Sequence, residues 1–361
     1  MKNKSVFFIG GQDILQKKIP KFISSNTSSI VLLMDINLKK YGYEKNILKI
    51  LKKFRIPIHL IEVEAGESLK KIKSVSSLYG QFLTLGIDRS SLLIVFGGGT
   101  LGDVGGFVAS TYLRGIKWIG IPTTLLAQVD SSIGGKTGIN HDLGKNLIGS
   151  FYEPLAIFSD PFYLKSLRLE EIISGLGEIV KYALIFDLKF FEWLENNILL
   201  LLKNDSKKLE KAIRVSIKWK IKTISQDYFD ETGIREVLNF GHTFGHALES
   251  LTHYKKYQHG EAIIWGMHFA LNLSFIQKTI SQENFIRIKK FLEKIPITPF
   301  PKKISFSSFL QAMKKDKKVK KGKIRFILLK KIGSTLTMTS IKEKKLKEAF
   351  MLMTEGKKND R

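Results

Sequence analysis

The sequence predicts an α/β N-terminal domain with a parallel sheet, followed by a mainly α-helical C-terminal domain. Short apolar segments typical of strands alternate with segments of helical periodicity over the first 120 residues, a pattern that favours parallel strands covered by helices on both faces. Strand signals nearly vanish from about residue 170, where long segments with helical spacing of apolar residues follow. The 361 residues suit two domains, which we place at residues 1–168 and 169–361.

The predicted strands of the first domain are apolar runs at residues 29–35, 56–64, 91–99 and 116–124. The predicted long helices of the second domain cover residues 169–186, 188–203, 205–226, 236–253 and 260–278. Near the end, residues 323–341 predict a hairpin or short strands. Residues 123–154 are too rich in Gly, Ser, Thr and Asn for a helix or a strand, and the apolar residues among them favour an ordered loop.

The composition excludes several classes of protein and of site. Hydrophobic residues make up 43% of the chain and aromatic residues 11%, enough for a sizeable core. Cysteine is absent, so any metal must be bound by His, Asp or Glu. The first apolar run is interrupted by Gly10, Gly11 and Asp13, and no run approaches the roughly 20 apolar residues that span a bilayer. We therefore expect a soluble, cytoplasmic protein without a membrane partner.

The net charge of +26 raises the hypothesis of a nucleic-acid partner. The lysines, however, are spread along the chain and densest at residues 314–323, without the interleaved aromatic residues typical of such binders. We expect no nucleic-acid partner. The excess of lysine would attract a small anionic substrate.

A glycine-rich turn follows the predicted strand at residues 91–99. The stretch VFGGGTLGDVGGF, residues 95–107, lets backbone N–H groups approach a phosphate at a helix N-terminus. Upstream, Asp35 ends a predicted strand, a position from which a carboxylate binds ribose hydroxyls or simply caps a helix.

The predicted loop at residues 123–154 carries charged and amide side chains. Asp130, Lys136, Lys145 and Asn146 lie among its glycines, and two lysines on an ordered loop suit a phosphate or a carboxylate. The alternative is an exposed loop with solvated lysines.

The predicted helices hold the candidate metal ligands. Glu178 lies on an apolar helix, where a carboxylate needs either a metal or an ion pair with Lys181. His242 and His246 share one helix face, as do the two histidines of a zinc-protease helix. The residue after His242 is Thr243, however, so the glutamate that serves as general base in that motif is missing. Glu178, His242 and His259 would suit one ion, His246 could replace any of them, and ordinary interior histidines remain the alternative. The histidines treated as structural are His59, His141, His253 and His268.

Six stretches, in order between about residues 90 and 330, carry a family resemblance: GGGTLGDVGGFVASTYLRG, IPTTLLAQVDSSIGGKTGINHDLGKNLIGSFYEP, GLGEIVKYALI, GIREVLNFGHTFGHALES, HGEAIIWGM and DKKVKKGKIRFILL. The chain resembles the dehydroquinate synthase family, NAD- and metal-dependent enzymes of the shikimate pathway. The resemblance implies a Rossmann-like N-terminal domain, an active site in the cleft between the domains, and a homodimer. It implies NAD⁺ and Zn²⁺ or Co²⁺ as cofactors.

The family converts 3-deoxy-D-arabino-heptulosonate 7-phosphate (DAHP) to dehydroquinate and phosphate. The expected sequence is transient oxidation by NAD⁺, phosphate elimination, re-reduction, ring opening and an intramolecular aldol closure. The nearest rivals are a metal-dependent polyol dehydrogenase of the glycerol type and a sister cyclase that makes an aminocyclitol precursor.

The resemblance also implies roles for individual residues. It assigns the metal to Glu178, His242 and His259, and leaves His246 to line the substrate pocket. The implied NAD⁺ contacts are Asp35, Asn37, Glu67, Lys70, Gly98, Gly99, Thr100, Leu101, Gly102, Asp103, Thr123, Thr124, Lys136, Lys145, Tyr163 and Ser166. The implied substrate-site residues are Arg114, Asp130, Lys136, Lys145, Asn146, Lys220, Glu231, Arg235, Asn239 and His246, with Lys317 or Lys318.

The chain departs from the family pattern at two places. Between Lys220 and Glu231 it has one residue more than is usual, because DYFDE stands where the family has DExE. Thr100 occupies a position of the glycine-rich turn where an aliphatic residue is common, a change expected to be tolerated because backbone groups make the contact.

Overall fold

The computed structural model describes residues 5–11, 13–301, 303–315 and 324–355. The chain forms two compact units. The first contains Met1–Leu167 and Ser206–Ile221, and the second contains Arg168–Asp205 and Lys222–Arg361. The helix α7 (Ser206–Gln226) therefore contributes most of its length to the first unit, although it follows two helices of the second.

The first unit is built on a six-stranded parallel sheet with the strand order β1-β8-β5-β4-β2-β3. Its strands are β1 (Val6–Ile9), β2 (Ile30–Asp35), β3 (Ile58–Val63), β4 (Leu92–Gly97), β5 (Lys117–Pro122) and β8 (Ala156–Ser159). The four strands predicted from apolar runs are confirmed. The two that the sequence did not predict, β1 and β8, have only four residues each.

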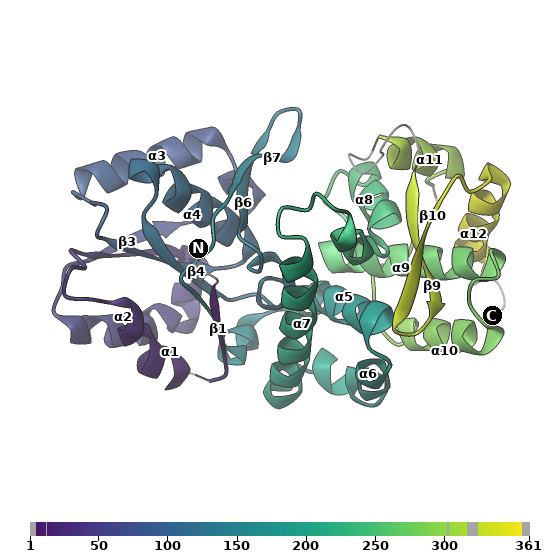
Figure 1. Ribbon diagram of the computed structural model, residues 1–361, viewed down its shortest axis with the longest axis horizontal. Coiled ribbons are helices and arrows are strands. Elements are labelled where there is room, and N and C mark those ends of the chain that lie inside the picture. The colour runs from purple at the N-terminus through teal and green to yellow at the C-terminus, as the bar shows by residue number, and fades with distance from the viewer. Residues whose placement is uncertain (1–4, 12, 302, 316–323, 356–361) are drawn as a thin grey trace. The chain divides into compact units, whose positions relative to one another are not determined.

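Helices cover both faces of this sheet (Figure 1). They are α1 (Asp13–Lys18) and α2 (Tyr43–Leu51) on one face, and α3 (Ile72–Thr84) and α4 (Gly99–Thr111) on the other. Successive residues of β2 point to opposite faces, so Leu32 packs in the core with α1 and α2 whereas Leu33 packs in the core with α3 and α4. The predicted parallel sheet covered on both faces is confirmed. The shorter helical turns of this unit are η1 (Ile19–Phe22), η2 (Ile36–Tyr41), η3 (Lys52–Phe54), η4 (Glu67–Leu69), η5 (Tyr112–Arg114), η6 (Ala127–Ser131) and η7 (Pro161–Ser166).

The stretch predicted to be a loop without regular structure, residues 123–154, is different in the structure. It contains a π-helical turn, η6, and an antiparallel hairpin of β6 (Lys136–His141) and β7 (Gly144–Phe151). Gly138 and Gly149 face each other across the hairpin, and a Cβ on Gly138 would lie 2.5 Å from the carbonyl oxygen of Ile148. The high glycine content led to the prediction of a loop, but in the structure these glycines allow two strands to pair closely.

The second unit is mainly helical, as the sequence predicts. Its helices are α5 (Leu169–Phe186), α6 (Leu188–Leu202), η8 (Ile234–Asn239), α8 (His242–Leu251), α9 (His259–Ile276), α10 (Gln282–Leu292), α11 (Phe306–Lys314) and α12 (Glu343–Glu355). The helix α9 is buried along most of its length and packs against α5, α8, α10, α12 and β9. The predicted hairpin near the end is confirmed as β9 (Arg325–Lys331) and β10 (Ser334–Thr339).

One predicted helix of this unit is wrong in its extent. The segment 236–253 is divided into η8 and α8 at Gly241, whose φ of 78° lies in the left-handed region. A helix cannot continue through that conformation. None of the helices in the described part of the chain has the length and apolar character that a membrane crossing requires.

Candidate active site

Three helices of the second unit cross closely and bring Glu178, His242 and His259 together. Each of these residues is next to a glycine in the sequence: Gly177 on α5, Gly241 before α8 and Gly260 on α9. A Cβ on Gly177 would lie 2.7 Å from Cα of Gly260, and one on Gly241 would lie 2.9 Å from the carbonyl oxygen of Ile263. The missing side chains therefore allow the backbones to approach to a distance at which the three neighbouring side chains meet.

The geometry of this triad, Glu178–His242–His259, suits a metal ion. Nε2 of His242 lies 3.5 Å from Oε1 of Glu178, and Nε2 of His259 lies 3.6 Å from the same oxygen. The three ligand atoms all lie within 4.8 Å of one another. Tetrahedral zinc sites have bonds of about 2.0–2.1 Å, which separate ligand atoms by about 3.4 Å. The observed separations are close to that value.

The far nitrogens of both histidines have partners that orient the rings. Nδ1 of His242 lies 3.1 Å from the carbonyl oxygen of Phe240, and Nδ1 of His259 lies 3.3 Å from Oε1 of Glu249. If each Nδ1 carries the proton, each Nε2 presents its lone pair towards Glu178. Hydrogen bonds of this kind are common behind the histidine ligands of metals.

The second oxygen of Glu178 pairs with Lys181. The two side chains are almost fully buried, with exposed fractions of 0% and 2%, and Oε2 of Glu178 contacts Nζ of Lys181. The sequence left an ion pair and a metal ligand as alternatives for Glu178. In the structure the carboxylate directs one oxygen to the lysine and the other to the histidines, so the two roles are compatible.

The triad attracts a positive charge. Burial would lower the pKa of His259, but hydrogen bonds and charge interactions with Glu178 and Glu249 outweigh it and raise the pKa to about 10. The carboxylates thus hold a proton on this histidine, and a metal ion would replace that proton.

A second group of candidate ligands shares His259. His246, Glu249 and His259 also offer ligand atoms within 4.8 Å of one another. The ring of His246 is 5.3 Å from that of His242 and 6.1 Å from that of His259, measured between centroids. His246 therefore lies beside the triad, and its role as a substrate contact rather than a ligand stays a prediction.

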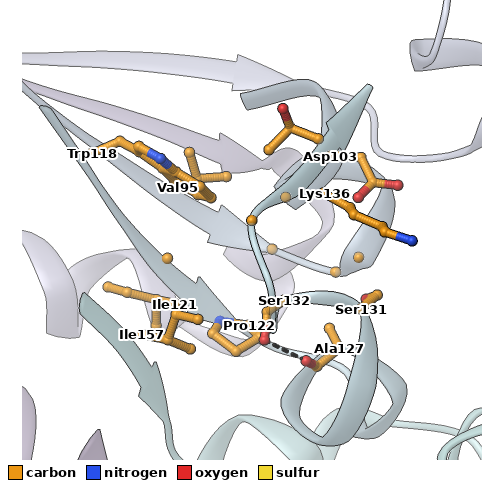
Figure 2. A pocket seen from close by; sticks show the side chains of 17 residues that line it. Val95, Asp103, Trp118, Ile121, Pro122, Ala127, Ser131, Ser132, Lys136 and Ile157 are labelled. Carbon is orange, nitrogen blue, oxygen red and sulfur yellow. Dashed lines mark hydrogen bonds between the residues drawn. The ribbon is translucent and has the colours of Figure 1, made fainter. Parts of the chain in front are cut away.

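The first unit has a pocket above the glycine-rich turn, with a volume of about 450 Å³ including solvent at its mouth. Figure 2 shows polar Asp103, Lys136 and Ser131 to the right of the view and apolar Trp118 and Ile157 to the left. Other lining residues are Gly98, Gly99, Gly102, Pro122, Ala127 and Ser132.

The turn leads directly from β4 into α4, whose N-cap is Gly98. A Cβ on Gly102 would meet no atom within 4 Å, so there is open space beside the first turn of the helix. The hydroxyl of Ser131 lies against Gly99, where a Cβ would be 2.5 Å from it. This arrangement exposes helix N–H groups to an anionic ligand.

Polar contacts link the predicted NAD⁺ residues to the hairpin. Lys70 is buried, and its Nζ lies 2.6 Å from Oδ2 of Asp103 and also contacts Oδ1 of Asn146. Glu67 accepts from Asn140 at 2.7 Å and lies 3.4 Å from Nζ of Lys145. The structure therefore groups Glu67, Lys70 and Asp103 with two of the predicted substrate residues.

Burial raises the pKa of the Asp103 carboxyl, although the charge of Lys70 opposes the shift. In the same unit, Nζ of Lys220 on α7 lies 2.6 Å from Oδ1 of Asp130 on η6. Lys220 is 9% exposed and Asp130 25% exposed. This close pair brings together two residues that are 90 positions apart in the sequence.

The loop with the extra residue is organised by Asp227. Its carboxylate accepts backbone hydrogen bonds from Glu231, Thr232 and Gly233 at 2.9–3.1 Å. Burial opposes the ionisation of Asp227, but these N–H donors outweigh it and lower the pKa to about 2. Asp230 takes up a left-handed conformation with φ of 62°, as a loop residue of this type can. Arg235 is buried after the loop and donates to the carbonyl oxygen of Tyr228 at 2.9 Å.

Three further residues predicted to contact NAD⁺, namely Asp35, Thr123 and Thr124, lie beside Gly97 or Gly98 of the glycine-rich turn. Asp35 caps η2 through the N–H of Asn37 at 3.0 Å and also lies beside Gly97. The N–H of Thr123 donates to the carbonyl oxygen of Gly97 at 3.0 Å, and the side chain of Thr124 contacts Gly98.

Other predicted residues are not among those that line the pocket, or cannot be described. Tyr163 is 1% exposed in the core, so its ring is not available to a ligand, and Ser166 donates to its carbonyl oxygen. Arg114 is exposed at the end of η5 and does not line the pocket. Asn239 ends η8 in the second unit. Lys317 and Lys318 lie outside the described residues.

Several residues around these groups were not predicted. Glu249 could have been found, because it lies seven residues after His242 and three after His246, on the same face of one helix. Ser131, Ser132 and Trp118 line the pocket but carry no distinct pattern in the sequence.

Comparisons with known proteins show the family to which the chain belongs. The family models for the N-terminal and C-terminal parts of 3-dehydroquinate synthase match residues 60–174 and 175–319. A 3-dehydroquinate synthase of Prochlorococcus marinus (strain MIT 9515) is 40% identical over 336 residues, 92% of each chain. Among solved structures, 2-epi-5-epi-valiolone synthase from Streptomyces hygroscopicus, with NAD⁺ and Zn²⁺ bound, has a TM-score of 0.87 at 23% identity over 98% of both chains.

A 2-deoxy-scyllo-inosose synthase complexed with carbaglucose-6-phosphate, NAD⁺ and Co²⁺ has a TM-score of 0.84 at 26% identity over 95% of both chains. These two cyclases share the fold, but the identity is clearly higher to the dehydroquinate synthase. The chain therefore belongs to the 3-dehydroquinate synthase family.

Proposed function

We propose that this chain is a 3-dehydroquinate synthase, a lyase that converts DAHP to 3-dehydroquinate and phosphate by the NAD-dependent sequence that the family uses. The observation that carries the proposal is the convergence of Glu178, His242 and His259 in a chain that is 40% identical to a protein of that name. The reaction is inferred from the relatives, which are 3-dehydroquinate synthases. The three candidate ligands could hold the metal ion that this reaction needs.

The residues of the triad fit a Zn²⁺ or Co²⁺ ion. Two imidazole nitrogens and one carboxylate oxygen form a donor set found in catalytic zinc sites, which leave a position for a substrate oxygen. When bound, the ion would supply positive charge that polarises the hydroxyl and carbonyl oxygens of the substrate. Lys181 and Glu249 hold the carboxylate and one imidazole in place, so the ligands are already oriented before the ion binds.

The groups beside the pocket of the first unit suit a dinucleotide. The turn at Gly98 and Gly99 offers backbone N–H groups, and Asp35 beside it offers a carboxylate for ribose hydroxyls. When bound there, NAD⁺ would supply a hydride acceptor and later the hydride donor. Asp103, held by Lys70, and Lys136 would orient the reactive end of the cofactor.

The cationic and amide residues would bind the two anionic groups of DAHP. We assign Lys136, Lys145, Asn146, Lys220 and Arg235 to the carboxylate and phosphate, because ammonium and guanidinium groups donate to both. Asp130 keeps Lys220 at a fixed position, and the loop built on Asp227 does the same for Arg235. The protein's contribution is then mainly to orient the substrate and exclude competing reactions.

The experiment is an assay of phosphate release from DAHP with catalytic NAD⁺ and added Zn²⁺ or Co²⁺, repeated after chelation. We expect release that stops on chelation and returns with the metal, with no net formation of NADH. A polyol dehydrogenase would instead accumulate NADH, and a sister cyclase would act on a different sugar phosphate. Folded, metal-loaded protein that releases no phosphate from DAHP would contradict the proposal. Light scattering of the same sample tests the homodimer, which stays a prediction.

A further inference from the structure

The strands β5 and β8 separate at their carboxyl ends. They are paired only at Ile119 with Ala156 and at Gly120 with Ile157, although β5 continues to Pro122 and β8 to Ser159. The pocket of the first unit is lined by Ile121 and Pro122 of this separated region, and by Gly120 and Ile157, the last pair before it. The width of the pocket therefore depends on how far apart these strand ends are held.

The side chain of Gln128 bridges the separated ends. Gln128 lies on the π-helical turn η6 and is 0% exposed. Its Nε2 donates to the carbonyl oxygen of Pro122 at 3.0 Å and to that of Asp160 at 2.9 Å. Both acceptors are main-chain oxygens, and the side-chain amide nitrogen carries two N–H donors, one for each of them. The side chain thus replaces the main-chain pairing that the two strands lack.

The same turn carries groups that face the pocket. Ala127, Ser131 and Ser132 line it, and Ser131 contacts the position where Gly99 lacks a side chain. The hydroxyl of Ser132 donates to the carbonyl oxygen of Ala127 at 2.6 Å, the bond drawn in Figure 2. Because Gln128 is part of η6, its two hydrogen bonds fix the turn against β5 and β8. Local π-helical turns of this kind often occur at functional sites.

We propose that Gln128 is a positioning residue for the nucleotide: it sets the distance between the ends of β5 and β8, and so the shape of the pocket that holds NAD⁺. The inference rests on the proposed function, since that function puts NAD⁺ in this pocket. It adds a residue that is fully buried, is not among those that line the pocket, and acts through the strand ends and through Ser131.

The test compares Gln128→Met with a matched control, Asn272→Leu. Asn272 is a buried amide of the second unit whose Nδ2 donates to the carbonyl oxygen of Ala349 at 3.3 Å, so its loss also removes a buried hydrogen bond. For each purified full-length protein, NAD⁺ affinity is measured by calorimetry and thermal stability by calorimetric scanning. The KM for NAD⁺ and kcat are measured in the phosphate-release assay.

We expect Gln128→Met to weaken NAD⁺ binding about tenfold, because about 1.4 kcal/mol of the binding free energy would be spent on restoring the spacing of the strand ends. The loss should appear in the KM for NAD⁺, and saturating NAD⁺ should restore kcat. A sample that was merely partly unfolded would show a low kcat at every NAD⁺ concentration. Asn272→Leu should lower the melting temperature and leave the NAD⁺ affinity unchanged.

Gln128→Asn serves if the methionine variant does not fold, because the shorter amide keeps the polarity but cannot reach both carbonyl oxygens. NAD⁺ affinity within twofold of the wild-type value in the folded variants would overturn the inference alone. A wild-type protein that binds no NAD⁺ would overturn the proposed function, and the inference with it.

Discussion

Oε1 of Glu249 lies 3.3 Å from Nδ1 of His259, which places a carboxylate directly behind one histidine of the triad. We predict that Glu249→Gln weakens metal binding about 10- to 100-fold, because such partners fix the ring and raise the basicity of the ligand. The protein should still bind one ion per chain at saturation. Competition with a chelator of known affinity, followed by elemental analysis, measures both quantities.

The exposed Glu293, in the same unit, provides the control. Glu293→Gln removes the same charge from the surface and should leave metal affinity unchanged. If Glu249 were itself a ligand, as in the second group with His246, Glu249→Gln would lose stoichiometric metal rather than affinity alone.

The assignment of the histidines gives the second prediction. His242→Ala and His259→Ala should each lose the bound metal, because each removes one of the three donors around the ion. His246→Ala should keep the metal and lose activity with DAHP. Elemental analysis of the dialysed variants measures the difference, with His253→Asn as an exposed control that suits the left-handed backbone at that position. Equal metal loss in all three alanine variants would contradict the division of roles.

Long-range contacts explain why this site could be predicted only in part. The spacing of His242 and His246 favours a pair on one helix, and nothing local indicates that His259 is the better partner. The partner follows from the crossing of α5, α8 and α9, which depends on glycines such as Gly177 and Gly260. These glycines matter because they let the backbones of α5 and α9 come close together. A contact between residues so far apart in the sequence is not visible in a local pattern. The family resemblance supplied the choice.

The fold shows the same limit. The strands β2 and β4 are continuous apolar runs because helices bury both of their faces, so their pattern predicts them. By contrast, β7 is mostly exposed and contains Gly149, whose absent side chain permits a close strand pair. Its composition resembles that of a loop, and only its pairing with β6 makes it a strand.

The helix crossing leads to the third prediction. Gly260→Ala should destabilise the protein by about 1–3 kcal/mol, the usual cost of overpacking a close contact. The added methyl group would overlap the carbonyl group of Ser174 and push α9 away from α5. Metal affinity should fall with stability, because His259 and Glu178 lie on these two helices. Urea denaturation and chelator competition measure the two effects.

Gly80→Ala is the matched control for this change. Gly80 lies within α3, and a Cβ there would meet no atom within 4 Å. Alanine has the higher helix propensity, so this variant should gain about 0.5–1 kcal/mol. A Gly260→Ala protein with wild-type stability and metal affinity would show that the helices tolerate a wider crossing.

Asp160 gives a prediction that depends on pH. Burial raises the pKa of its carboxyl to about 6, although the N–H of Phe162, which it accepts at 2.8 Å, opposes the shift. The folded state therefore binds this proton more tightly than the unfolded state, whose aspartate has a pKa of about 3.9. The contribution to stability is present at low pH and is lost as the pH rises from about 4 through 6.

Asp160→Asn cannot ionise and keeps an oxygen that caps η7, so it should not show this loss. We predict that the melting temperature of the variant, relative to that of the wild type, is higher at pH 8 than at pH 5. All other titrating groups are common to the two proteins and cancel in the difference. Any change in melting temperature that comes from burying the amide of the variant is the same at pH 5 and at pH 8. The change of the difference with pH therefore measures the ionisation of the Asp160 carboxyl alone. A difference that stays constant between pH 5 and 8 would show that Asp160 ionises at the same pH in the folded and unfolded chains.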